Sequence, residues 1–457
     1  MMEARQKPYD FLEYTTSLCS ECLRTVPGKI VARDGRIHIR KHCATHGPQE
    51  ELLEDNAEYF IHRNEFSRPG SSCDVQTATV NGCPYDCGLC PNHEQHTCIG
   101  LIEVNTGCDM CCPTCYAESG KPGDLSLPTI QRMIDFYITS ENGHAEILQV
   151  SGGEPTLHPR ILEILDYARS TKLAYVMLNT NGLRIASDEP FVRELARMVG
   201  NFEVYLQFDG LDARVSESLR GRNYIPDKLR AVGMLAKHNI PTTLVMTVQA
   251  GTNDEQIGDV VAFAMRHGNI RGVSFQPMAF FGRRPLASPP HDRATLTGVL
   301  QRIEEQTAGL VKVSDFAPLP CAVDRVAVTF LYRQQGDYVP VTRGMDLRQY
   351  LPYIRNTFAF RAEEFIAATD AAASCCGFLG KFVRSFTLKS TAERVQYIND
   401  NLFRLSVVSF IDAYNFDMKA MQKECVHVIT PDLHKIPFSA YNLLHRSKYV
   451  SHYLSTH

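Results

Sequence analysis

Short apolar runs alternate with amphipathic stretches from residue 100 to residue 278. The apolar runs predict six strands, over 100–105, 145–151, 174–179, 203–208, 242–248 and 272–278. Between them, apolar residues recur at helical spacing and predict helices over 129–138, 162–170, 191–199, 227–239 and 255–267. Strands that alternate with helices are typical of repeated βα units around a parallel sheet. The pattern therefore predicts an α/β fold, a partial (β/α)6 barrel whose loops converge at the carboxyl ends of its strands.

The regions on either side of this repeat have different patterns. Before it, IVARDGRIHIRK alternates around Asp34-Gly35, which is a strong hairpin signal. After about residue 310, AVTFLYR, EEFIAATDAAA and a final strand-turn-strand pattern predict a mixed α+β domain. We expect a β module over 1–65, a cysteine-rich segment over 66–99, the barrel over 100–310 and the mixed C-terminal domain over 311–457.

Charge and hydropathy exclude several classes of partner. The net charge of -4 gives no broad basic field, so we do not expect nucleic acid as the main partner. No apolar run approaches about 18 residues, so no transmembrane segment is predicted. The first residues lack the apolar core of a secretion signal, and the expected compartment is the cytoplasm.

Cysteines are concentrated in the first quarter of the chain. Twelve of the 16 lie between Cys19 and Cys115, many at two- or three-residue spacings that favour metal sites over disulfides. Cys19 and Cys22 precede the predicted hairpin, while Cys43 and His46 follow it. This arrangement is typical of a zinc ribbon. A rubredoxin-like mononuclear iron is the alternative, although iron would prefer a fourth sulfur.

The loop after the first predicted barrel strand reads GCDMCCPTCY. Its Cys108, Cys112 and Cys115 stand at C-x3-C-x2-C spacing. Three thiolates can hold three irons of a 4Fe-4S cluster and leave the fourth open to a ligand from outside the protein. Cys111 offers an alternative set with the reversed spacing, and we favour Cys112.

This loop, followed after the next strand by SGGEPTLHP, resembles the corresponding motifs of the radical S-adenosylmethionine (SAM) superfamily. The resemblance implies that SAM chelates the open iron and that the GGE segment hydrogen-bonds its amino group. It also implies an aromatic residue beside the adenine and polar strand ends near the ribose or carboxylate. The residues at matching positions are Tyr116, Gly152, Gly153, Glu154, Asn179, Asn181, Gln207 and Asp209, with Gln276 a weaker candidate.

A second cysteine set precedes the barrel. Cys83, Cys87 and Cys90 repeat the C-x3-C-x2-C spacing, and Cys98 offers a fourth thiolate. A four-cysteine cluster has no open iron, so we interpret this set as an auxiliary 4Fe-4S cluster, with zinc as the alternative. His93 and His96 are expected in the loop rather than among the ligands.

Four later cysteines leave two interpretations open. Cys321, Cys375, Cys376 and Cys425 could form a third metal site, or could be buried thiols.

Along nearly the whole chain, the motifs resemble a subgroup named for pterin dimethylation or for archaeal tetraether lipid synthesis. The resemblance implies reductive cleavage of SAM to a 5'-deoxyadenosyl radical, which abstracts hydrogen from an unactivated carbon for methylation or carbon-carbon bond formation. It further implies a small-molecule or lipid substrate and an electron donor such as flavodoxin or ferredoxin. The alternative is a multi-cluster electron carrier or metal-binding scaffold that does not turn over SAM.

Overall fold

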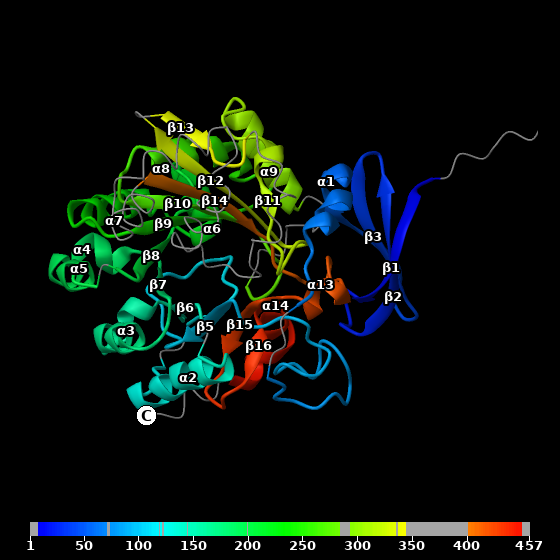
Figure 1. Cartoon of the computed structure of the whole chain (residues 1–457), viewed down its shortest axis with the longest axis horizontal. Coiled ribbons are helices and arrows are strands. Elements are labelled where there is room, and N and C mark those ends of the chain that lie inside the picture. The colour runs from blue at the N-terminus through cyan, green and yellow to red at the C-terminus, as the bar shows by residue number, and fades with distance from the viewer. Residues whose placement is uncertain are drawn as a thin grey trace, which may run out of the picture.

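The computed structural model describes residues 8–70, 74–117, 119–120, 123–143, 145–198, 200–283, 293–334, 337–343 and 401–449. A central twisted sheet is covered by helices, and a small separate sheet lies at one side of it (Figure 1). The predicted helical stretch EEFIAATDAAA lies outside the described residues.

The six predicted parallel strands are all present and pair in chain order. They are β5 (Ile99–Glu103), β6 (Ile147–Ser151), β7 (Tyr175–Thr180), β8 (Phe202–Gln207), β9 (Thr242–Val248) and β10 (Ile270–Pro277). The predicted helices correspond to α2 (Leu127–Ser140), α3 (Ile161–Ser170), α5 (Glu189–Ala196), α7 (Ile225–Lys237) and α8 (Ile257–Met265). The prediction of a partial (β/α)6 barrel is confirmed.

Local sequence explains where these helices begin and which face they bury. At α2, the Ser126 side chain accepts a hydrogen bond from the Thr129 backbone, satisfying one of the unpaired N–H groups of the first turn. Ile130, Met133 and Tyr137 follow at three- and four-residue spacing and are fully buried. Two shorter helices were not predicted, α4 (Leu183–Ser187) and α6 (Ala213–Arg220), and both follow barrel strands.

The C-terminal residues extend the barrel sheet at both ends. β14 (Leu402–Val408) pairs in parallel with β10, while β15 (Val426–Ile429) pairs in parallel with β5. β11 (Ala317–Pro318), β12 (Val326–Gln334) and β13 (Asp337–Pro340) continue beyond β14, and β16 (Lys435–Pro437) continues beyond β15. The strand-turn-strand pattern of the final segment is confirmed. The domain boundary at residue 310 stays a prediction, although these strands share the barrel's sheet.

The N-terminal module is a four-stranded antiparallel sheet of β1 (Asp10–Leu18), β2 (Thr25–Arg33), β3 (Arg36–Cys43) and β4 (Gly47–Glu54). The predicted hairpin joins β2 to β3, and both turn residues, Asp34 and Gly35, have positive φ. The module lies beside α9 (Leu296–Gln306) and α13 (Met418–Gln422) in Figure 1. There the Glu54 carboxylate accepts from the Thr297 backbone at 2.8 Å, which fixes the module to α9.

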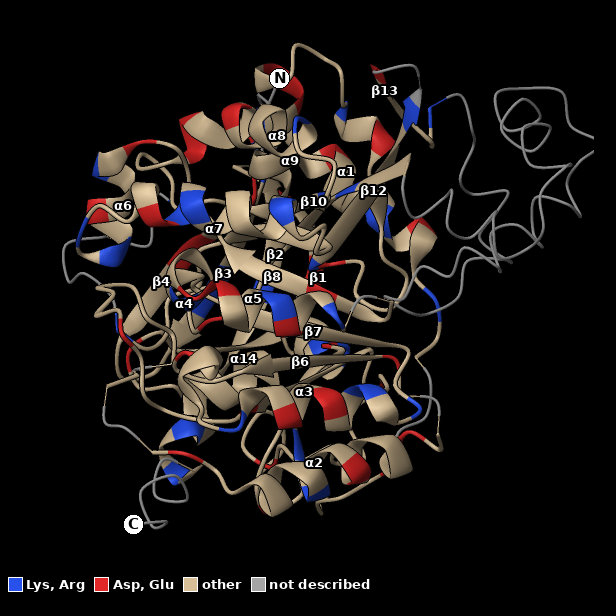
Figure 2. Cartoon of the chain, turned by 90° about the vertical axis from the view of Figure 1, so that its left-hand side faces the viewer, with Lys and Arg blue, Asp and Glu red and all other residues tan. Residues whose placement is uncertain are grey.

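Charges are spread over the outer helices rather than gathered into one field. In Figure 2, both acidic and basic residues occur on α2 and on α3. Among the residues described, none of the helices combines the length and apolar character needed to cross a membrane.

A buried ion pair joins the segment before α9 to the C-terminal part of the chain. Arg293 and Asp412 are 4% and 0% exposed, and their charged groups lie 2.7 Å apart. The Asp412 carboxylate also accepts the backbone N–H groups of Phe280 and Tyr414, both at 2.9 Å. This pair therefore ties three separate segments together.

Replacement of this carboxylate should destabilise the fold strongly. Asp412→Ala leaves the buried Arg293 charge without its partner, and we expect a loss of about 3–5 kcal/mol in the free energy of unfolding. Urea unfolding followed by circular dichroism measures this change. Asp259→Ala, at an exposed position in the first turn of α8, is the control and should change stability by no more than about 1 kcal/mol. Equal unfolding midpoints for the two variants would contradict the prediction.

Candidate functional site

The loop between β5 and α2 presents three thiols at the carboxyl end of the barrel. Cys108, Cys112 and Cys115 are half-buried, whereas Cys111 is exposed. Burial raises the pKa of Cys108 to about 12, and the nearby charges of Glu154 and Cys112 act in the same direction. Burial likewise raises the pKa of Cys112, and the charge of Cys115 adds to this effect. The three predicted thiols are therefore partly enclosed in one loop, and Cys111 is the most exposed of its four cysteines.

Two arginines that the sequence did not indicate lie beside these thiols. Arg220, at the end of α6, is held by Asp209 through two hydrogen bonds of 2.7 and 2.8 Å. Its positive charge lowers the pKa of Cys112 against the larger effect of burial. Burial opposes a thiolate at Cys115, but its pKa is lowered overall, first by hydrogen bonds to Ser119 and then by the hydrogen bond and charge of Arg283, after β10. Positive charge beside thiols favours the thiolate form that binds iron.

Arg283 also has capacity for a ligand. Its backbone N–H donates to the Cys115 carbonyl at 2.9 Å, which places the side chain at the cysteine loop. Its guanidinium hydrogen-bonds the Cys115 thiol, and its Nε and Nη2 atoms are buried. A buried guanidinium in this state is suited to an anionic group such as a carboxylate.

The glycines of the GGE segment interlock with the cysteine loop. Gly153 donates its backbone N–H to the Asn105 carbonyl at 2.9 Å, and Glu154 donates to the Gly107 carbonyl at 2.8 Å. A Cβ on Gly153 would lie 2.2 Å from the Gly107 oxygen, so no side chain fits there. Gly152 has a φ of 151°, which also favours glycine. The cysteine loop and the glycine segment therefore form one unit.

Glu154 joins the ends of two barrel strands. It is 1% exposed, and its carboxylate accepts from the Thr156 backbone at 3.1 Å, the Thr180 hydroxyl at 2.6 Å and the Asn181 backbone at 2.7 Å. Burial raises the pKa of this carboxyl despite these donors. The sequence predicted a contact with SAM for the GGE segment. The structure adds a role in fixing β6 against β7, and the contact stays a prediction.

The predicted polar strand ends lie at the same mouth, where each already has a hydrogen-bond partner within the protein. Asn181 Nδ2 donates to Asp109 at 2.7 Å, and Asn179 Nδ2 donates to Gln149 at 3.2 Å. The Asn179 Oδ1 atom is buried without a partner among the described residues and could accept from a ligand. Asp209 is occupied by Arg220, so its direct contact with SAM is a prediction that the structure leaves open.

A buried lysine completes this polar network and was also missed by the sequence analysis. Lys228 of α7 is 3% exposed and donates to Gln207 Oε1 at 2.6 Å and to the Asn181 carbonyl. Burial lowers its pKa to about 8. Helical periodicity predicted α7, but it could not show that this lysine points inward.

Tyr116 lies between the cysteine loop and the C-terminal segment. Its ring packs edge-on against Phe438, with centroids 5.4 Å apart, and burial raises its pKa to about 12. The Arg446 guanidinium lies 5.7 Å from this ring and pairs with Glu103, at the end of β5, at 2.7 Å. The C-terminal segment is thereby tied to the mouth. The predicted place of Tyr116 beside adenine stays a prediction.

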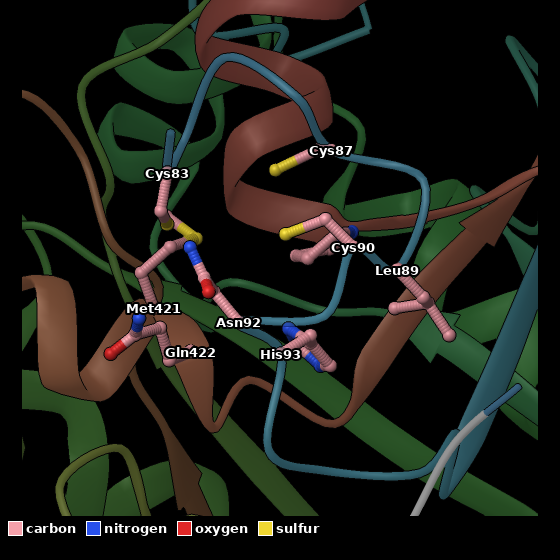
Figure 3. Close-up of a pocket in the computed structure, with 9 residues that line it drawn as sticks. Cys83, Cys87, Leu89, Cys90, Asn92, His93, Met421 and Gln422 are labelled. Carbon is pink, nitrogen blue, oxygen red and sulfur yellow. The ribbon is translucent and has the colours of Figure 1, made fainter. Parts of the chain in front are cut away.

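Cys83, Cys87 and Cys90 point into a common cavity (Figure 3). Its other walls include His93 from the same loop and, from the C-terminal segment, Met421, Gln422 and Pro437. Burial raises the pKa of Cys83 to about 12 and that of Cys87 well above its usual range. Convergent thiols around a cavity fit the predicted auxiliary cluster, whose identity stays a prediction.

The structure does not bring Cys98 to this cavity, contrary to the grouping made from the sequence. The backbone N–H of Cys98 donates to the Cys425 carbonyl at 2.9 Å, because β5 pairs with β15 directly after these residues. The ligand atoms of Cys98, Cys321 and Cys425 all lie within 4.8 Å of one another. Sequence spacing could not reveal this, since Cys425 follows Cys98 by more than three hundred residues. Cys375 and Cys376 lie outside the described residues.

The four predicted ligands of the N-terminal module converge. Cys19, Cys22, Cys43 and His46 present ligand atoms within 4.8 Å of one another. His46 Nδ1 lies 3.4 Å from the Cys19 sulfur and 3.5 Å from the Cys43 sulfur. Three thiols and one imidazole at these separations fit a tetrahedral zinc ion.

Comparison with known proteins agrees with these centres. Residues 102–264 match the radical SAM superfamily, and residues 11–55 match the HMPTM N-terminal zinc ribbon domain. The chain is 30% identical to 7,8-dihydro-6-hydroxymethylpterin dimethyltransferase of Methanocaldococcus jannaschii, over 95% of this chain and 94% of that protein. It is 31% identical to a mycofactocin maturase of Mycobacterium ulcerans, over 36% of this chain and 44% of that protein. The solved structure of SuiB from Streptococcus suis matches 48% of this chain and 47% of its own, at 18% identity and a TM-score of 0.39.

The chain belongs to the radical SAM superfamily of enzymes. Membership implies a 4Fe-4S cluster and SAM as cofactors, and the three thiols at the barrel mouth have the donor chemistry that such a cluster needs. The N-terminal module is a zinc ribbon.

The two adjacent cysteines of the loop should differ in their effect on the cluster. Cys112→Ala removes a thiol that lies against Arg220 and should lose the cluster at the barrel mouth, whereas Cys111→Ala removes an exposed thiol and should retain it. Iron and acid-labile sulfide, measured after anaerobic reconstitution, give the result. The reverse outcome would reassign the ligand to Cys111.

A methyl group at Gly153 should disrupt the interlock. Gly153→Ala forces a Cβ against the Gly107 carbonyl, and we expect weaker SAM binding by equilibrium dialysis together with lower stability. Gly233→Ala is the matched control, because its Cβ would meet nothing within 4 Å on α7 and alanine favours a helix by about 1 kcal/mol. Unchanged SAM affinity in Gly153→Ala would show that the interlock does not shape the SAM site.

Proposed function

We propose that this enzyme reductively cleaves SAM at a cluster held by Cys108, Cys112 and Cys115, and that a 5'-deoxyadenosyl radical then abstracts hydrogen from an unactivated substrate carbon. One electron from an external donor of the flavodoxin or ferredoxin class splits a carbon-sulfur bond of SAM and releases methionine. Hydrogen abstraction yields 5'-deoxyadenosine and a substrate radical. Methylation or carbon-carbon bond formation follows on a small-molecule or lipid substrate.

The interlock of the cysteine loop with the glycine segment is the observation that supports this proposal. Backbone hydrogen bonds from Gly153 and Glu154 fix the glycine segment directly against the loop that carries the three thiols. A cofactor bound to a cluster in that loop would have to lie at the same strand ends. An electron carrier would have no use for a cofactor site built at this position.

When bound, the cluster and SAM supply the electron transfer and the radical, while the protein's residues position and shield them. Arg220 and Arg283 place positive charge beside the thiolates, and the guanidinium of Arg283 could also donate to a carboxylate. Lys228 orients the amide of Gln207. These groups are held by internal hydrogen bonds, so binding requires little rearrangement of the mouth.

An aromatic wall protects the mouth from water. Phe438 contacts Tyr116, Phe281 and Phe410, with ring centroids 5.4, 6.1 and 4.5 Å apart respectively. Exclusion of water and of stray hydrogen donors is what a reactive carbon radical requires. The C-terminal segment that bears Phe438 therefore serves the chemistry as well as the fold.

The relative from Methanocaldococcus jannaschii is named for dimethylating a reduced pterin, and it is similar along nearly the whole chain. A reduced pterin is therefore the first small-molecule substrate to test. Long alkyl chains form the second class, because the aromatic wall beside Tyr116 would suit an apolar substrate.

Anaerobic reduction of the reconstituted enzyme with SAM should yield 5'-deoxyadenosine, detected by mass spectrometry. Cys112→Ala should give only background, and Asp259→Ala should match the parent enzyme. Deuterated pterin or deuterated lipid should transfer deuterium to 5'-deoxyadenosine if it is the substrate. Absence of product from an enzyme with its full complement of iron and sulfide would identify an electron carrier instead.

A further inference from the structure

A further set of thiols lies in the interior, and none of them lines the auxiliary cavity. Cys98, Cys321 and Cys425 are each no more than 1% exposed, and their sulfur atoms all lie within 4.8 Å of one another. The Cys425 thiol lies 3.7 Å from the Cys321 sulfur. We propose that these three thiols bind a single tetrahedral metal ion of the zinc class.

The separation of the sulfurs supports one ion rather than an iron-sulfur cluster. Thiolates bound at about 2.3 Å to a tetrahedral ion lie about 3.8 Å apart. The zinc ribbon provides a comparison within the same chain, since its Cys22 and Cys43 sulfurs are 3.9 Å apart. A 4Fe-4S cluster places each thiolate on a different iron and so keeps the sulfurs farther apart. Two other sets of three cysteines are not this close. Among the described residues, the sulfurs of Cys108, Cys112 and Cys115 do not all lie within 4.8 Å of one another, nor do those of Cys83, Cys87 and Cys90.

The site lies where the two ends of the open sheet approach each other. Cys321 lies between β11 and β12, at one end of the strand order, whereas Cys98 and Cys425 directly precede β5 and β15 near the other end. Val326 and Val408 from the first end share a buried apolar cluster with Ile99 from the second. A metal ion held here would join both ends of the sheet.

Chemistry favours a metal over three packed thiols. A buried cysteine can pack as a small apolar side chain. Such packing does not require the sulfurs of three distant segments to meet. A divalent ion stabilises thiolates that would otherwise be costly to bury. The His96 imidazole lies beside the site, with its Nε2 3.7 Å from the Cys98 sulfur, although it is not within 4.8 Å of all three sulfurs. The Gln95 amide, 2.9 Å from His96 Nδ1, orients that ring.

The count of mononuclear metal in the reconstituted full-length protein tests the proposal. Iron equals acid-labile sulfide in a 4Fe-4S cluster, so iron plus zinc in excess of sulfide counts the single ions. We expect two per chain, one in the ribbon and one at this site. Cys22→Ser should reduce the excess to one by removing the ribbon ion. The proposal is overturned if the parent protein has only one metal ion per chain in excess of sulfide and Cys22→Ser abolishes it, because the ribbon would then hold the single ion. This outcome needs no variant at the new site.

Variants at the new site give a second measurement. Cys321→Ser and Cys425→Ser should each lower the excess from two to one and lower the thermal unfolding midpoint. Ala322→Ser places a hydroxyl at a buried neighbouring position without removing a thiol, and it should keep both ions. If the two cysteine variants keep both ions, the three thiols are packed without a metal. If they lose iron and sulfide in equal amounts, the thiols hold an iron-sulfur cluster. Either result overturns the assignment of a single ion. Production of 5'-deoxyadenosine reports separately on the proposed reaction.

Discussion

The contact between two strand-end loops is the constraint on which the barrel mouth depends. Gly153 and Glu154 donate backbone hydrogen bonds to the loop that follows β5, and Asn105 returns one from its side chain to the Glu154 carbonyl at 2.8 Å. Because the partners are backbone groups in close approach, the geometry tolerates no Cβ at Gly153. Glu154 then extends the connection to β7 through Thr180 and Asn181. Three consecutive strands are thus held in one arrangement around the thiols.

Much of the fold follows from sequence because βα units are local. Each apolar run pairs with the next one along the chain, so the order of β5 to β10 could be predicted from periodicity alone. The hairpin at Asp34-Gly35 was predictable for the same reason, since two adjacent residues determine the turn. The extension of the sheet by β14 and β15 was not predictable, because each joins a strand distant in sequence and nothing in its composition specifies its partner.

Some residues of the candidate site could likewise be predicted from the sequence, and others could not. Cysteine spacing predicted the loop of Cys108, Cys112 and Cys115 and the four converging residues of the ribbon, because each set comes from short segments. It did not indicate that Cys98 meets Cys321 and Cys425, since the register between β5 and β15 decides where that thiol lies. Arg220, Arg283 and Lys228 had no sequence signal at all. Their roles depend on which face of an element points inward, and tertiary packing decides that.

The closing of the auxiliary cavity by Met421, Gln422 and Pro437 bears on how the enzyme matures. The thiols of that cavity emerge early during synthesis, whereas its walls arrive only after more than three hundred further residues. Until then, nothing from the C-terminal segment shields the thiols from solvent or oxidants. A chain cut before residue 421 would lack this wall, and its three cavity thiols would be open to oxidation.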